Sequence, residues 1–291
     1  MSLLLYLMAV LVLVYAVAGL TLLFLQPRLL YQPTRDVTLT PADISLDFEQ
    51  VSFPSGDGVM LSGWYVPAKE ARFTVLFCHG NGGNIMHGLD SLRLFHDLHL
   101  NSFAFDYRGY GRSAGRPGEA GTYLDAQAAY DWLVQAKRVP AGQIILFGHS
   151  LGGSVAAHLA ARVQARALVV EGAFTSYPDI GARFYPYMPV RWFAFFRYDT
   201  QSHIRQVRCP VLVMHSRTDD LVPFEFGVRL YEAANEPKQF AEILGSHNDS
   251  LEVAGDAYRD AWRNWLDFVS QVGERESQPW APESVHEARR E

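Results

Sequence analysis

The chain has 291 residues, of which 49% are hydrophobic and 19% are charged, and its 31 acidic residues outnumber 25 Lys and Arg to give a net charge of −6. These values exclude an intrinsically disordered protein, a collagen-like repeat and a small disulfide scaffold. The acidic balance argues against a dedicated nucleic-acid-binding protein, because phosphate binding draws on a clustered Lys and Arg surface. Cys78 and Cys209 form no zinc-binding spacing and leave the cellular compartment undecided.

The N-terminus reads as a membrane anchor over residues 1–26. Leu3 to Leu25 carry no charge, and as a helix they would rise about 35 Å, which exceeds a hydrocarbon core of about 30 Å. The alternative is a cleaved signal peptide, since Ala16-Val17-Ala18 resembles a cleavage site. However, no Lys or Arg precedes the apolar run, and the run continues beyond that site. We therefore expect residues 3–25 to contact the bilayer as a single-pass anchor, with Arg28 and Arg35 favouring a cytoplasmic body.

The next segment, 27–47, reads as a polar connector whose Pro27 ends the helix. Beyond it, short apolar runs that suit buried strands alternate with longer helical patterns. The first two runs flank the hairpin-like turn Ser55-Gly56-Asp57-Gly58. The expected strands are Phe48–Phe53, Val59–Val66, Thr74–Cys78, Ser102–Asp106, Ile144–Gly148, Ala167–Glu171, Val211–His215 and Gln239–Leu244. The alternation predicts an α/β protein with a mostly parallel central sheet and helices on both faces.

The pattern predicts helices over Thr122–Ala136, Ser154–Val163 and Leu251–Val272. We expect one domain over residues 48–272. The last segment, 273–291, is rich in charge and poor in apolar residues, which is typical of a disordered tail.

A Gly-x-Ser-x-Gly motif, Gly148-His149-Ser150-Leu151-Gly152, directly follows the expected strand Ile144–Gly148 and opens an Ala-rich helix. This strand-turn-helix setting is what a nucleophile elbow requires, and only small residues fit on either side of Ser150. The alternative is a helix-capping Ser after a glycine turn. A Ser hydroxyl needs a neighbouring base, and the base needs an orienting carboxylate.

In a Ser-acid-His order, Asp219 is the favoured acid because it follows the strand Val211–His215 after a short polar turn. Asp220 and Glu171 remain the alternatives. His247 is the favoured base, because it lies in a loop between the last strand and the terminal helix, whereas His215 falls within a strand.

An oxyanion needs two backbone N–H donors that already point at the site. The elbow supplies the N–H of Leu151, and the glycine-rich loop His79-Gly80-Asn81-Gly82-Gly83 supplies that of Asn81. This loop matches neither phosphate-binding pattern, Gly-x-x-x-x-Gly-Lys-Ser/Thr or Gly-x-Gly-x-x-Gly. We expect no metal, because His96 and His99 lack accompanying ligands, and no cofactor.

Together, these pieces resemble the α/β-hydrolase superfamily, and most of all its membrane-associated serine hydrolases. The resemblance covers roughly residues 48–270 and rests on His79-Gly80-Asn81, the run Phe105–Ser113, the elbow, the Asp219 turn ending in Val222-Pro223, and His247-Asn248-Asp249. It implies Ser150 as nucleophile, Asp219 as acid, His247 as base, and Asn81 and Leu151 as oxyanion donors. It leaves the substrate open, since that branch contains esterases, lipid hydrolases and thioesterases.

One segment, rich in aromatic residues, bears on the kind of substrate. Eight of the fifteen residues from Phe184 to Tyr198 are aromatic, within a stretch of about 175–205 where lids are often inserted. Either this is a helix packed on the core, or it is a lid that lines an acyl pocket or touches the bilayer through Trp, Tyr and Arg side chains.

The sequence thus favours a membrane-anchored serine hydrolase that cleaves carboxylic esters or thioesters of acyl or lipid-like substrates. The alternatives are a serine peptidase acting on short peptides and a non-catalytic anchored binding protein.

Overall fold

The computed structural model describes the backbone of residues 3–277 and the side chains of residues 3–272. An eight-stranded sheet in the order β10-β9-β8-β7-β4-β6-β3-β2 forms its centre. The pairs β2–β3 and β3–β6 are antiparallel and the others are parallel. The strands are β2 (Glu49–Pro54), β3 (Met60–Val66), β4 (Phe73–Cys78), β6 (Leu100–Asp106), β7 (Ile144–His149), β8 (Ala167–Glu171), β9 (Val211–Ser216) and β10 (Lys238–Ile243).

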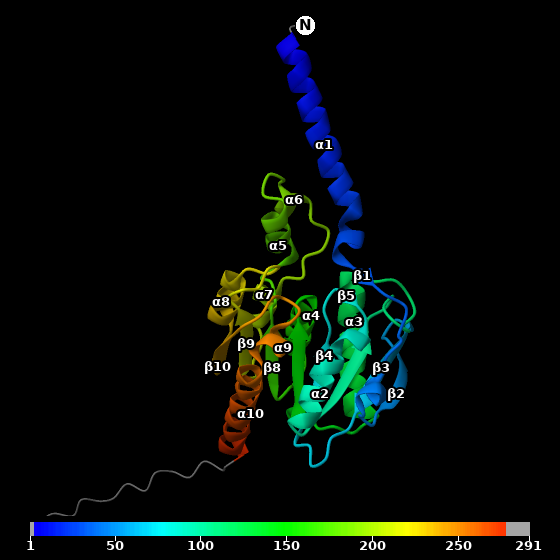
Figure 1. Ribbon diagram of the computed structural model, residues 1–291, viewed down its shortest axis with the longest axis vertical. Coiled ribbons are helices and arrows are strands. Elements are labelled where there is room, and N and C mark those ends of the chain that lie inside the picture. Colours follow the sequence, from blue (N-terminus) through cyan, green and yellow to red (C-terminus); the bar gives the residue numbers. More distant parts are fainter. Residues whose placement is uncertain (1–2, 278–291) are drawn as a thin grey trace, which may run out of the picture.

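Helices cover both faces of this sheet (Figure 1). The helices of the described chain are α1 (Leu3–Leu30), α2 (Leu89–Asp97), α3 (Glu119–Gln135), α4 (Leu151–Ala160), α5 (Tyr177–Phe184), α6 (Val190–Phe193), α7 (Thr200–Ile204), α8 (Phe224–Ala233), α9 (Ser250–Ala254) and α10 (Asp256–Ser277), of which α1, α5 and α6 extend away from the sheet. Short 3-10 helices span Pro41–Ile44, Ile85–Gly88 and Ala141–Gln143.

Two apolar clusters, one on each face, make up the core. The first packs α3, α4, α7 and α8 on the sheet, and the second packs α2 and α10. The inner strands are buried along their whole length, as β4 and β9 illustrate. Strands covered on both faces are continuous apolar runs, so the expected mostly parallel α/β sheet is confirmed.

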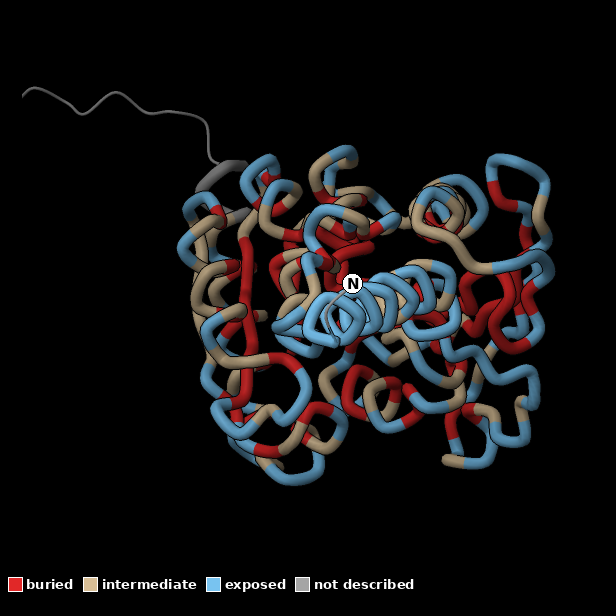
Figure 2. The backbone as a smooth tube through the Cα atoms, turned by 90° about the horizontal axis from the view of Figure 1, so that it is seen from above, coloured by how far each residue is buried: buried red, intermediate tan, exposed pale blue. Residues whose placement is uncertain are grey.

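The N-terminal helix α1 stands apart from this body, and Figure 2 shows it exposed when the molecule is seen from above. It has a mean hydropathy of 2.7 in its most apolar window and is long and apolar enough to cross a membrane. Directly after it, β1 (Gln32–Pro33) pairs in parallel with β5 (Gly82–Gly83). The end of α1 is thereby fixed to the loop that follows β4.

Several helix boundaries differ from the sequence-based expectation: α3 and α4 each begin three residues earlier, and α1 and the terminal helix differ more. The helix α1 does not end at Pro27, because one missing N–H is tolerated: the chain continues to Leu30, and the N–H of Tyr31 donates to Pro27 O at 2.9 Å. The terminal helix is not continuous, because Gly255 adopts a φ of 50°, in the left-handed region that helices cannot include, and separates α9 from α10. The tail expected over 273–291 begins too early, because α10 continues to Ser277. The rest of that expectation, for residues 278–291, lies outside the described residues.

Candidate active site

Ser150 lies at the sharp turn between β7 and α4, with a φ of 54° and a ψ of −119°. A non-glycine residue with this backbone is strained, and such strain concentrates at functional sites. The turn is possible only because its flanks lack side chains. A Cβ on Gly148 would lie 2.2 Å from Gly152 O, and one on Gly152 would lie 1.9 Å from Cys78 O. The two glycines therefore let α4 begin directly against the ends of β7 and β4.

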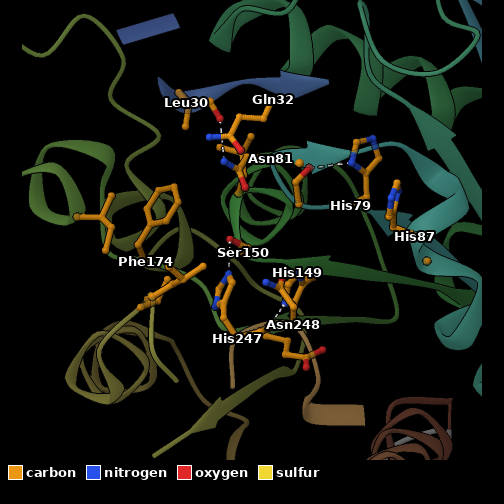
Figure 3. Close-up of a pocket in the computed structure, with 18 of the residues that line it drawn as sticks. Leu30, Gln32, His79, Asn81, His87, His149, Ser150, Phe174, His247 and Asn248 are labelled. Atoms are coloured by element: carbon orange, nitrogen blue, oxygen red, sulfur yellow. Dashed lines mark hydrogen bonds between the residues drawn. The ribbon is translucent and has the colours of Figure 1, made fainter. Parts of the chain in front are cut away.

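Three side chains from separate loops meet at this turn. The Nε2 atom of His247 lies 2.9 Å from Ser150 Oγ, and its Nδ1 lies 2.8 Å from Asp219 Oδ2. Since a carboxylate only accepts, Nδ1 carries the proton, and Nε2 is free to accept the hydrogen of the Ser150 hydroxyl. The side chains of Ser150 and His247 are labelled in Figure 3, one pointing at the other.

The carboxylate of Asp219 is held in place by its own turn. Its Oδ1 accepts hydrogen bonds from the N–H groups of Leu221 at 2.9 Å and Val222 at 2.7 Å. Burial would raise the pKa of Asp219, but the hydrogen bond and charge interaction with His247, together with the two N–H donors, lower it below its ordinary value. Asp219 is therefore ionised and able to stabilise a protonated His247.

The two alternative acids have other partners. Asp220 turns to the loop backbone and accepts the N–H of His247 through Oδ1 at 3.0 Å. Glu171 is buried and accepts a hydrogen bond from Tyr258 Oη at 2.6 Å. Burial raises the pKa of Glu171 to about 7, an effect that the bond from Tyr258 partly offsets. Neither carboxylate contacts the imidazole, so the geometry singles out Asp219.

Two backbone N–H groups of segments next to Ser150, those of Leu151 and Asn81, have no acceptor among the described residues. Leu151 is the first residue of α4, so its N–H has no partner within the helix. The N–H of Asn81 likewise donates to no acceptor within the described part of the chain. The loop that carries Asn81 lies close to the elbow, because a Cβ on Gly80 would lie 3.7 Å from Ser150 Cβ.

The end of α1 and the strand β1 hold the Asn81 loop in place, which the sequence did not indicate. Asn81 Nδ2 donates to Leu30 O at 2.9 Å, and Asn81 O accepts from Gln32 N at 3.1 Å and from Tyr110 Oη at 2.8 Å. These bonds fix the side chain and the carbonyl group of Asn81. The segment that follows the apolar helix is thus built into the site.

His149, the variable residue of the elbow motif, was also not singled out from the sequence. Its Nε2 donates to the carbonyl oxygen of His247 at 3.0 Å. Burial lowers the pKa of His149 to about 4, so the ring is neutral at physiological pH. No motif could have identified this role, because it depends on how the His247 loop crosses the elbow.

A cavity of about 930 Å³ opens above Ser150. Figure 3 shows Ser150 between Phe174 on one side and His79 and His87 on the other. Further apolar lining comes from α1 and α5, through Leu29, Leu30, Tyr177, Ile180 and Phe184. None of the described residues that line the cavity is Lys or Arg. A neutral, chain-like group fits such a lining better than a phosphate or a free carboxylate.

Comparison with known proteins identifies the family of this chain. The sequence model of the alpha/beta hydrolase fold matches residues 74–221, which include Ser150 and Asp219. An uncharacterized Mycobacterium tuberculosis protein is 36% identical over 252 residues, covering 86% of this chain and 90% of that protein. Alpha/beta hydrolase domain-containing protein WAV2 of Arabidopsis thaliana is 33% identical over 285 residues, covering 88% and 91%. The chain therefore belongs to the α/β-hydrolase fold family.

Solved structures show the same fold. The Pyrococcus furiosus esterase Pf2001 superimposes with a TM-score of 0.69 at 22% identity, covering 82% of this chain and 97% of that chain. An alpha-beta hydrolase from Vibrio vulnificus gives a TM-score of 0.66 at 21% identity, covering 79% and 87%. The resemblance to the α/β-hydrolase superfamily expected from the sequence is confirmed.

Proposed function

We propose that this protein is a membrane-anchored serine hydrolase that cleaves carboxylic esters or thioesters of acyl substrates through an acyl-enzyme. The observation that carries the proposal is the hydrogen-bonded series Ser150 Oγ, His247 Nε2, His247 Nδ1 and Asp219 Oδ2, at 2.9 and 2.8 Å. A strained Ser with a base in reach and a buried orienting carboxylate is the constellation that activates a hydroxyl for acyl transfer. A non-catalytic binding protein would have no use for this strain.

In the first half-reaction, the Ser150 oxygen attacks the acyl carbon while His247 Nε2 takes the hydroxyl proton. The N–H groups of Asn81 and Leu151 stabilise the negative oxygen of the tetrahedral intermediate. The bond from the acyl carbon to the leaving oxygen or sulfur then breaks, and His247 gives its proton to the leaving group. Asp219 stabilises the imidazolium throughout and is not itself protonated.

In the second half-reaction, water replaces the leaving group. His247 Nε2 removes a proton from the water molecule as its oxygen attacks the acyl carbon of the ester on Ser150. The collapse of this intermediate returns the proton to Ser150 Oγ and releases a carboxylic acid. No step requires a metal or cofactor.

The apolar cavity supports an acyl substrate. Its apolar lining includes Leu30, Phe174, Tyr177 and Ile180. Apolar burial contributes about 0.8 kcal/mol per CH₂ group, so a lining of this kind favours an alkyl chain over a short peptide with charged ends.

The helix α1 supports the anchor. It runs without a break through Ala16–Ala18 to Leu30, and its most apolar window is 0% buried against the rest of the protein. We place the catalytic body on the cytoplasmic side on the basis of Arg28 and Arg35. Retention in the membrane after alkaline carbonate extraction, with Met1 or Ser2 still at the N-terminus, tests the anchor against a cleaved signal.

Labelling with a fluorophosphonate tests the nucleophile. The full chain in detergent should be labelled covalently, and Ser150→Ala should not. Ser154→Ala is a matched control, since Ser154 is a buried Ser of the same helix whose Oγ lies 2.8 Å from Thr200 Oγ1. Labelling that survives Ser150→Ala would contradict the proposal.

A further inference from the structure

The segment 177–198, which we call the aromatic hairpin, leaves several large apolar side chains exposed. It contains α5 and α6, which rise from the body beside α1 in Figure 1. The exposed fractions are 89% for Tyr187, 89% for Trp192, 61% for Phe195 and 54% for Phe184. A surface that is dense in exposed aromatic residues marks an interaction site rather than ordinary solvent-facing surface.

The side-chain amide of Gln26, near the end of the apolar helix, binds the hairpin. Gln26 Nε2 donates to Phe193 O at 3.1 Å, and Phe195 N donates to Gln26 Oε1 at 2.8 Å. Both ends of one amide thus bind the returning arm of the hairpin, and Gln26 is 5% exposed. These bonds set the position of the hairpin relative to α1.

A second contact lies farther along α1, within its uncharged run. Tyr15 Oη donates to Tyr187 O at 2.7 Å. Tyr15 precedes Gln26 by 11 residues, so the hairpin follows α1 for about 16 Å. Because Tyr15 lies inside the run from Leu3 to Leu25, the medium that surrounds this run also surrounds the tip of the hairpin.

The charges of the hairpin suit the same location. Arg191 pairs with Asp179 at 3.0 Å, so its guanidinium is turned back toward the base of the hairpin. The tip is left with Tyr187 and Trp192, two large aromatic side chains without a formal charge. A paired charge near the base and an uncharged aromatic tip suit a segment that lies beside the uncharged run of α1 in lipid.

The cavity opens at the base of the hairpin, where α5 faces the end of α1. Leu29 on α1, Phe184 on α5 and Leu221 line the cavity and are 40%, 54% and 41% exposed. Leu30 follows Leu25 by five residues, which is about 8 Å along a helix, and the headgroup layer is about 5–8 Å thick on each side of the hydrocarbon. The mouth of the cavity therefore lies at headgroup depth, with an apolar rim.

From these contacts we propose that the aromatic hairpin is a second membrane contact, and that the site takes acyl esters whose chain remains embedded in the adjoining leaflet. The chain enters sideways, between Leu29 and Phe184, without crossing water. This inference rests on the proposed function for its chemistry. The membrane contact itself stands on the exposed aromatic residues and on the Gln26 and Tyr15 bonds.

Quenching of Trp fluorescence tests the membrane contact independently of catalysis. The full chain is reconstituted in phosphatidylcholine vesicles with or without brominated acyl chains, and Trp192→Phe is measured in parallel. We expect brominated lipid to quench the wild-type protein more strongly than Trp192→Phe. Equal fractional quenching of both proteins would overturn the membrane contact.

Hydrolysis in two settings tests the route of entry. The double variant Tyr187→Ser, Trp192→Ser removes the two most exposed aromatic residues, and Leu124→Ser with Val253→Ser is a control at two exposed sites of the body (42% and 57% exposed). We expect the hairpin variant to hydrolyse a long-chain acyl ester in vesicles at least tenfold more slowly, because its tip no longer holds the cavity mouth against the leaflet. Its rate on a water-soluble butyrate ester should match that of the wild type.

Gln26→Leu provides a second variant with an intact hairpin sequence. It removes both hydrogen bonds to the hairpin, so the vesicle rate should again fall while the butyrate rate remains. An equal fall in the rates on both esters, or an unchanged rate on the vesicle ester, would overturn the proposed entry of the acyl chain from the leaflet. If the wild-type protein hydrolyses neither ester and is not labelled by fluorophosphonate, the proposed function fails, whereas the quenching result still decides the membrane contact.

Discussion

His149 Nε2 donates a hydrogen bond to the carbonyl oxygen of His247, with a distance of 3.0 Å between the two atoms. The residue directly before Ser150 thus holds the loop that carries the base of Ser150. Together with the bond from His247 N to Asp220 Oδ1, it fixes both sides of the His247 backbone. The distance from imidazole to hydroxyl is therefore set by the elbow itself.

Loss of the His149 bond should slow catalysis without weakening substrate binding. In His149→Leu the loop loses its donor, and a displacement of the imidazole by about 1 Å can cost about 10²-fold in rate. His149→Gln keeps an N–H donor and should recover most of kcat. Steady-state kinetics with a soluble ester should show the change in kcat rather than KM. A His149→Leu enzyme with wild-type kcat would refute this role.

The two neighbouring carboxylates should differ sharply when each is converted to its amide. Asp219→Asn replaces the acceptor of His247 Nδ1–H with a group that can present a donor, which favours the wrong tautomer. We expect kcat to fall about 10⁴-fold, as known for this change in other serine hydrolases. Asp220→Asn keeps an oxygen that can accept His247 N–H, so its loss should stay below about tenfold. The reverse order of effects would make Asp220 the acid.

Glu171 should make the fold less stable as the pH rises. Burial raises its pKa in the folded state from 4.5 to about 7. The folded state therefore keeps its full stability below pH 4.5, where Glu171 is protonated, and loses stability as the pH rises through 7. The total change is about 3 kcal/mol. Glu171→Gln keeps an acceptor for Tyr258 and cannot ionise. Thermal unfolding in detergent should show the melting temperature of Glu171→Gln rising relative to that of the wild type between pH 5 and pH 8. A constant difference in melting temperature would contradict the raised pKa of Glu171.

The close approach at Gly152 should not tolerate a methyl group. A Cβ there would lie 1.9 Å from Cys78 O, whereas one on Gly142 would meet nothing within 4 Å. Gly152→Ala should therefore lose several kcal/mol of stability or fail to fold, because the contact is with backbone on both sides. Gly142→Ala should unfold at the wild-type temperature. Equal stability of the two variants would mean that the elbow is looser than described.

Much of this architecture could be predicted from the sequence because it depends on local pattern. Continuous apolar runs identify strands that are covered on both faces, and the strand-turn-helix setting identifies the elbow at Ser150. The order of Asp219 and His247 after Ser150 follows from the alternation of strands and loops. These features are encoded by neighbouring residues.

Other features depend on contacts that no local pattern records. The Asn81 loop is held by Leu30 O and Gln32 N, which belong to a segment that reads as a simple connector. The aromatic hairpin is held by Gln26, a single amide at the end of an apolar run. Pro27 misled the prediction because one missing hydrogen bond does not end a helix whose last turn packs on other residues, and Leu30 is 6% exposed.

Trapping the covalent intermediate is the most direct test of the account. The full chain is mixed with a long-chain acyl ester, quenched in acid within the first turnover, digested and examined by peptide mass spectrometry. We expect an acyl group esterified to Ser150, which accumulates before steady state and is absent from Ser150→Ala. An acyl group on any other residue, or hydrolysis by Ser150→Ala at the wild-type rate, would contradict it.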